Sequence, residues 1–193
     1  EFINSVIIPD TVLCIENGAF DNCVNLKTVE IGNNVEKISQ YAFNNCKVLK
    51  NIVLSKSVMH IGYNAFGETA VESIEIPKSL DTCGGGTGPF YNCYNLKTVV
   101  FENGVTQIPQ YLFAFCTGIE EIIIPDSVTV IKNSALYNAE SLRKIKLSEN
   151  LTSIGENAFR SCGALEEIII PDSVTSIGIN CFDGCSSLES VKL

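Results

Sequence analysis

The chain has 193 residues and a hydrophobic content of 46%, enough to bury a core as one domain. Its 13 Lys and Arg against 22 Asp and Glu give a formal net charge of −9, which argues against a nucleic-acid partner. No run approaches the roughly 18 consecutive apolar residues of a membrane span, so we expect no membrane insertion of this segment.

One apolar motif, L-x-x-[IV]-x-[IL], recurs along the chain. Aligned on its β-branched residue, the units begin at Val6, Val29, Ile52, Ile74, Val99, Ile122, Ile145, Ile168 and Val191. The intervals are 23 residues except for one of 22 and one of 25. A single unit cannot bury its apolar face, so the period predicts a solenoid of stacked units. We expect one domain over 1–193, with partial repeats at both ends and eight repeats at 6–28, 29–51, 52–73, 74–98, 99–121, 122–144, 145–167 and 168–190.

Within each unit the predicted elements follow in a fixed order. A short strand with inward residues at every second position comes first, and a proline such as Pro125 ends it. Two further inward positions follow, typified by Leu151 and Ile154, and then a small residue and an aromatic, typified by Ala158-Phe159. We predict an α/β-type leucine-rich-repeat horseshoe. A parallel sheet would form its concave face, with short strands, turns and 3-10 or single-turn helices on the convex side.

The motif IPDSVTSIG-x-x-[AC]F-x-x-C-x-x-L-E-x-[IV], complete from Ile170 to Val191, resembles the BspA-like, or Treponema pallidum type, leucine-rich-repeat family. The resemblance covers essentially the whole chain. It implies a cell-surface or secreted location and adhesion to host or matrix proteins. We therefore expect a non-enzymatic protein-binding module of a larger protein, which binds its partner through the concave sheet. The alternative is a structural spacer that presents another domain.

Two columns of strand residues are predicted to carry specificity, because their side chains do not enter the core. The face column consists of Ile7, Glu30, Val53, Glu75, Val100, Ile123, Lys146, Ile169 and Lys192. Its five aliphatic members suggest a protein contact, although β-propensity alone also favours Ile and Val in exposed strands. The rim column consists of Asn4, Lys27, Lys50, Glu72, Lys97, Glu120, Arg143, Glu166 and Glu189, and it changes from mostly basic to mostly acidic.

Nine cysteines raise the question of disulfides or a metal site. Six occupy one column of the repeat: Cys23, Cys46, Cys93, Cys116, Cys162 and Cys185. Thr69 and Ala139 take the same column in the other two units, so the position requires a small residue. We predict a buried structural column of reduced thiols. Of the remaining cysteines, only Cys14 is expected to be exposed.

No catalytic, cofactor or metal site is predicted. His60, the only histidine, falls in a variable column that we expect to be exposed, and no cysteine adjoins it as nucleophilic catalysis would require. Cys181 and Cys185 supply at most two of the four ligands of a zinc site. The glycine-rich segment 83–89, which holds two extra residues, lacks the Lys-Ser/Thr of a phosphate-binding loop. We expect a flexible bulge there, with a hinge or contact loop as the alternative.

Overall fold

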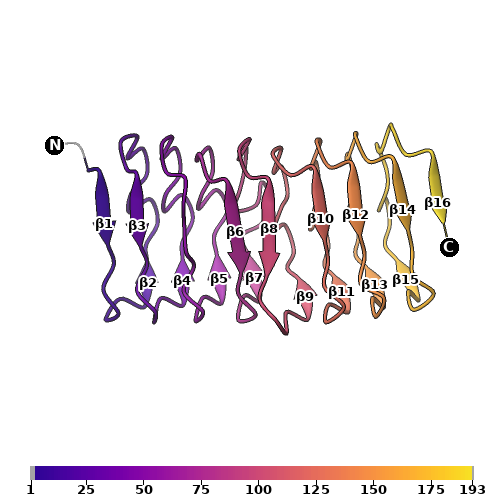
Figure 1. The fold of residues 1–193 in the computed structure, drawn as a ribbon, viewed down its shortest axis with the longest axis horizontal. Helices are drawn as coiled ribbons and strands as arrows, with labels where there is room; N and C mark the ends of the chain where they lie inside the picture. The colour runs from indigo at the N-terminus through magenta and orange to yellow at the C-terminus, as the bar shows by residue number, and fades with distance from the viewer. Residues whose placement is uncertain (1–2, 193) are drawn as a thin grey trace.

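The computed structural model describes residues 3–192 as a stack of about eight turns built from short parallel strands. One strand of each turn lies in a row along the long axis (Figure 1). These strands are β1 (Ser5–Ile7), β3 (Thr28–Glu30), β6 (Ser73–Ile76), β8 (Thr98–Phe101), β10 (Glu121–Ile123), β12 (Lys144–Lys146), β14 (Glu167–Ile169) and β16 (Ser190–Lys192). The third turn contributes the single residue Asn51, which bridges to Thr28 and to Ser73, instead of a strand.

A second row of two-residue strands lies farther along each turn. It contains β2 (Cys14–Ile15), β4 (Lys37–Ile38), β5 (His60–Ile61), β7 (Thr82–Cys83), β9 (Gln107–Ile108), β11 (Val130–Ile131), β13 (Ser153–Ile154) and β15 (Ser176–Ile177). Pairing joins equivalent residues of successive units, as in Val6 with Val29 and Ile38 with Ile61. The parallel-strand solenoid predicted from the repeat is therefore confirmed.

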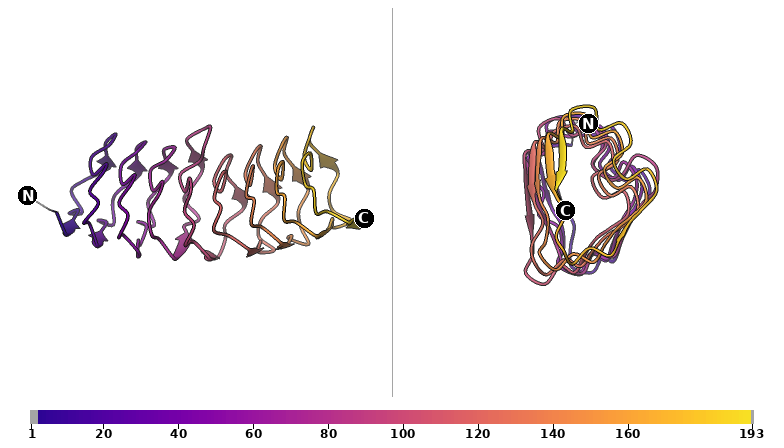
Figure 2. Two further views of the ribbon diagram at one scale, coloured as in Figure 1. Left: turned by 90° about the horizontal axis from the view of Figure 1, so that it is seen from above. Right: turned by 90° about the vertical axis from the view of Figure 1, so that its right-hand side faces the viewer.

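The core runs without interruption through the stack, because each apolar column packs on its own copies in the neighbouring turns. Viewed end on, the turns superimpose on one closed outline (Figure 2). The aromatic column is a ladder: Phe20 and Phe43 stack with ring centroids 5.2 Å apart, and Phe43 and Phe66 stack at 5.5 Å. The small-aromatic pair therefore lies in a turn packed on the core, as its residue types predict.

The predicted 3-10 or single-turn helices are wrong, since residues 3–192 contain turns and strands but no helix. Two equivalent residues of each turn have positive φ, such as Tyr41 and Asn45 at 57° and 59°, and this conformation ends a right-handed helix. Between them, the N–H of Phe43 donates to the carbonyl oxygen of Ala65 in the next turn at 2.7 Å. Backbone donors are thus satisfied across turns. No helix that could span a membrane exists in the described residues.

The row of turns bends only slightly along its length (Figures 1 and 2), so it is more extended than the predicted horseshoe. The outward surface of the first row of strands, which we predicted to be concave, is called the strand face below.

Candidate protein-binding face

The face column points to solvent along the whole strand face. Its five aliphatic members are between 51% and 77% exposed, namely Ile7, Val53, Val100, Ile123 and Ile169. Within β10 and β14 the middle residues, Ile122 and Ile168, are buried, as the period of two requires. The charged members Glu30, Glu75, Lys146 and Lys192 are also exposed. The face therefore combines apolar and charged side chains along the solenoid.

The rim column is exposed too, but many of its charges are already paired with their neighbours. Lys50 Nζ lies 2.9 Å from Glu72 Oε1, and Lys97 Nζ lies 2.6 Å from Glu120 Oε1. The pKa of Glu120 is held below its usual value by the Lys97 ammonium group. At the centre of this column, basic and acidic side chains therefore neutralise each other in pairs.

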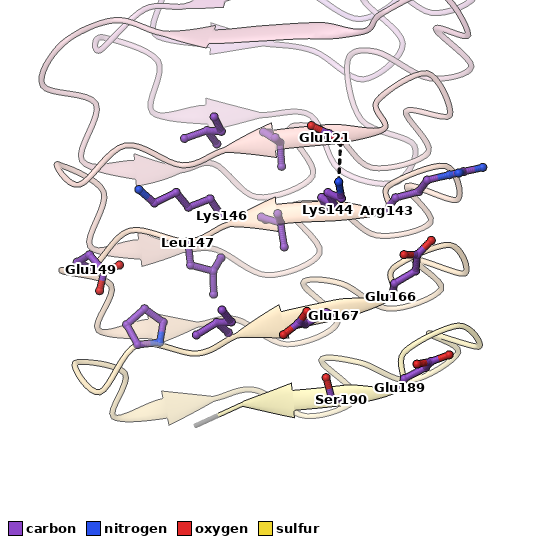
Figure 3. A pocket seen from close by; sticks show the side chains of 15 residues that line it. Glu121, Arg143, Lys144, Lys146, Leu147, Glu149, Glu166, Glu167, Glu189 and Ser190 are labelled. Carbon is purple, nitrogen blue, oxygen red and sulfur yellow. Dashed lines mark ion pairs between the residues drawn. The ribbon is translucent and has the colours of Figure 1, made fainter.

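A groove of about 690 Å³ crosses the strand face at β10, β12, β14 and β16. Figure 3 shows Lys146 and Leu147 at one side of it and Arg143, Glu166 and Glu189 at the other. Ile123 and Ile169 line it from the strands on either side of β12. Lys144 at its centre pairs with Glu121 at 3.5 Å. The groove thus combines aliphatic side chains with charges of both signs, which suits a protein surface more than a small apolar ligand.

The cysteine column packs with the core and takes no part in the strand face. Cys46, Cys93, Cys116 and Cys162 are completely buried, whereas Cys23 and Cys185 at the two ends are half-buried. The Cys93 thiol donates to the carbonyl oxygen of Phe66 at 3.1 Å. Burial raises the pKa of Cys46 to about 12 and that of Cys93 to about 11. These thiols are therefore held in their protonated, unreactive form.

Two exposure predictions need correction. Cys14 is half-buried because its Sγ lies 3.6 Å from Ser39 Oγ of the next turn, and Cys83 is half-buried as well. His60 is also half-buried, since its Nδ1 lies 2.8 Å from Thr82 Oγ1. Burial, together with the Lys37 charge, lowers the pKa of His60. In residues 3–192, no three His, Cys, Asp or Glu side chains are grouped to hold a metal ion.

The glycine segment is anchored at both ends and open at its tip. A Cβ on Gly84 would lie 2.1 Å from the Tyr63 nitrogen, and a Cβ on Gly88 would lie 2.3 Å from the Tyr111 oxygen. A Cβ on Gly86 would meet nothing within 4 Å. Only the tip therefore corresponds to the predicted bulge.

The rim ion pairs and the groove were missed by sequence reasoning. The signal for the pairs was present, because Lys50 and Glu72, like Lys97 and Glu120, occupy equivalent positions of adjacent units. The groove is lined by side chains of four strands, so the sequence of a single unit does not indicate it.

Comparison with known proteins agrees with this architecture. A model of the BspA type leucine rich repeat region matches residues 1–87 and 86–193, in six copies. A crystal structure of a leucine-rich repeat protein from Bacteroides ovatus is 30% identical, with a TM-score of 0.78, over 97% of this chain and 48% of that one. One from Eubacterium ventriosum is 23% identical, with a TM-score of 0.65, over 95% of this chain and 59% of that one.

The chain thus spans about half the length of the Bacteroides ovatus protein. No curated protein matches it. The family match covers the described stack from end to end, and its repeat accounts for the columns of the core. This chain belongs to the BspA type leucine-rich repeat family.

Proposed function

We propose that the chain is a non-enzymatic protein-binding module that acts in adhesion, and that the strand face is its contact surface. The observation that carries this proposal is the row of exposed aliphatic side chains, five on one face and each more than half accessible. Exposed apolar side chains gathered on one surface are typical of protein interaction sites. Membership of the family supports a location at the cell surface or outside the cell.

The groove supports the same surface. Ile123 and Ile169 would supply apolar contact, and the surrounding Lys and Glu side chains would form a polar rim. Interfaces of this composition, with an apolar centre and a charged border, give both affinity and orientation. A host or matrix protein is the kind of partner that the family membership suggests.

The test is capture of extracellular matrix proteins by immobilised chain, with wild type compared with the double variant Ile123→Glu and Ile169→Glu. Two new carboxylates in the groove should abolish capture, since a partner would have to desolvate them. The matched control is Leu13→Glu with Met59→Glu, which changes two exposed apolar side chains next to β2 and β5. A spacer role, the alternative function, predicts no capture by wild type. Equal capture by all three proteins would rule out the strand face.

A further inference from the structure

The charged residues of the strand face are arranged in a symmetric order along the solenoid. Nine positions are counted from β1 to β16, with the Asn51 bridge as the third. The face column reads, in this order, Ile7, Glu30, Val53, Glu75, Val100, Ile123, Lys146, Ile169 and Lys192. The rim column reads Asn4, Lys27, Lys50, Glu72, Lys97, Glu120, Arg143, Glu166 and Glu189. Acidic residues precede basic ones in the face column, and the rim column has the opposite polarity.

A half-turn about an axis parallel to the strands reverses the order of the positions while it keeps the strand direction. If the axis passes between β8 and β10, position two of one copy faces position nine of another, three faces eight, four faces seven and five faces six. Each column then faces the same column of the second copy, as an isologous contact requires.

Every pair that this operation produces in the face and rim columns is complementary. In the face column the pairs are Glu30 with Lys192, Val53 with Ile169, Glu75 with Lys146, and Val100 with Ile123. In the rim column they are Lys27 with Glu189, Lys50 with Glu166, Glu72 with Arg143, and Lys97 with Glu120. Charges meet opposite charges and aliphatic side chains meet aliphatic side chains, so the two columns independently select the same register.

Neighbouring registers fail. With the axis on β8, Lys97 faces its own copy and Glu72 faces Glu120. With the axis on β10, Glu120 faces its own copy, and in the face column Lys146 faces Val100. Like charges that face each other in an interface cost several kcal/mol. The face and rim columns therefore favour one register and oppose the adjacent ones, whereas the outward column between them, with Glu121, Lys144 and Glu167, faces uncharged residues in that register.

We propose that the strand face binds a second copy of this chain, face to face, about the two-fold axis between β8 and β10. The inference rests on the proposed function, because it takes the strand face as the binding surface and names its partner. Lys146 lies between Ile123 and Ile169, so any partner that covers these two aliphatic side chains also covers the ammonium group. A covered charge needs a counter-charge, and Glu75 of the second copy supplies it.

The central face-column pair of this contact, Glu75 with Lys146, is built from charges that form no ion pair within residues 3–192, whereas Lys192 already pairs with Glu167. Among residues 3–192, neither Glu75 nor Lys146 has an oppositely charged group within 4.0 Å. In the rim column the existing Lys50–Glu72 pair would face Glu166 and Arg143, so that four charges of alternating sign form a closed set. The single chain thus leaves Glu75 and Lys146 for a partner and arranges the rim charges to extend into a network.

The size of the contact predicts a weak association. Seven intervals of about 4.8 Å and four residues of about 3.3 Å give a footprint of roughly 34 by 13 Å. About 450 Å² per copy is below the roughly 800 Å² per partner of a stable complex. We expect a dimer with a micromolar dissociation constant that weakens as salt is added, since much of the contact is ionic.

Sedimentation velocity at low salt, from about 1 to 300 µM chain, tests the proposal with a charge-swap series. Glu75→Lys should weaken the dimer at least about tenfold, because the new ammonium group would face Lys146 of the second copy. Lys146→Glu should do the same, since its new carboxylate would face Glu75. The double variant Glu75→Lys with Lys146→Glu should restore association to within about threefold of wild type, because both facing pairs are complementary again.

The two single variants change the net charge of −9 in opposite directions, so a shared loss is not due to general repulsion between copies. The control Glu36→Lys, on an exposed residue next to β4, should leave the dimer unchanged. A monomeric wild type over the whole range overturns the proposal. A double variant that stays monomeric, or a Glu36→Lys variant that is weakened equally, also overturns it.

The outcomes separate this inference from the proposed function. A monomeric wild type that still captures matrix protein, and loses capture with Ile123→Glu and Ile169→Glu, overturns only the second copy as partner. A dimer that responds to the charge swap, with no capture of matrix protein, supports the second copy and rejects a host partner.

Discussion

Phe43 and Phe90 occupy the same column of the repeat, but their rings stack differently. Around Phe43, neighbouring rings are 5.2 and 5.5 Å apart and tilted by 8° and 2°. Around Phe90, the separations are 5.6 and 6.1 Å and the tilts are 13° and 24°. Phe90 follows the two extra residues of the fourth unit, whereas Phe43 lies between units of regular length. The insertion therefore disturbs the core as well as the loop.

The hydrogen-bonded ladders are interrupted on either side of the fifth unit, next to the insertion. Within residues 3–192, neither sheet pairs across from β7 to β9 or from β8 to β10. Between β7 and β9 a side chain bridges the gap, since Gln107 Nε2 donates to Asp81 Oδ1 at 2.6 Å. The Lys78 N–H donates to Glu102 Oε2 at 3.0 Å and joins the same two units, beside the paired strands β6 and β8. The comparison teaches that a strict repeat length keeps both backbone ladders continuous, and that next to a change of length each ladder is interrupted once and side-chain hydrogen bonds supplement the remaining pairing.

The largest effect should come from the aromatic ladder itself. Phe43→Ala should lower the free energy of unfolding by about 3–5 kcal/mol, because a fully buried ring is lost. Phe90→Ala should cost up to about 1 kcal/mol less, since its ring contributes weaker stacking. Urea denaturation measures both. Phe43→Leu is the control, as Leu136 already occupies this column. If both variants lose the same free energy of unfolding, the difference in ring stacking between Phe43 and Phe90 has no effect on stability.

An intermediate effect is expected within the insertion. Gly84→Ala should lower the free energy of unfolding by about 3 kcal/mol or more, because its Cβ would overlap the Tyr63 backbone. Gly86→Ala has open space but a φ of +82°, so only backbone strain of about 1–2 kcal/mol applies. Thermal unfolding of the two variants gives the comparison. A larger loss of stability in Gly86→Ala than in Gly84→Ala would contradict an open tip and a tightly packed Gly84.

The smallest effect should come from the side-chain bridge at the junction. The pKa of Glu102 is held below its usual 4.5, chiefly by the Lys78 N–H and then by Lys56. A carboxylate with a lowered folded-state pKa stabilises above the unfolded value, and this contribution is lost as the pH falls through the folded value. Glu102→Gln should therefore unfold more readily than wild type near pH 7, and the difference should shrink below about pH 4. Urea midpoints at the two pH values measure this, and a constant difference would contradict it.

The sequence by itself determined the repeat, the register of the turns and the composition of the core. Leu26, Phe43 and Cys46 are fully buried because each column must pack on its own copies, and that requirement is visible as a period in the sequence. The family followed from the same columns. The members of the face column could be named for the same reason, since strand periodicity separates inward from outward positions.

Only the tertiary structure decided how the backbone of each turn is satisfied and which surface charges remain free. The donors of residues such as Phe43 find acceptors in the next turn, so local helix propensity could not decide the outcome. The Lys50–Glu72 pair, and the lack of an ion pair for Lys146 within residues 3–192, likewise depend on side chains of different turns. A period states which residues are equivalent, whereas hydrogen bonds and ion pairs depend on the distances that the stacked turns impose between them.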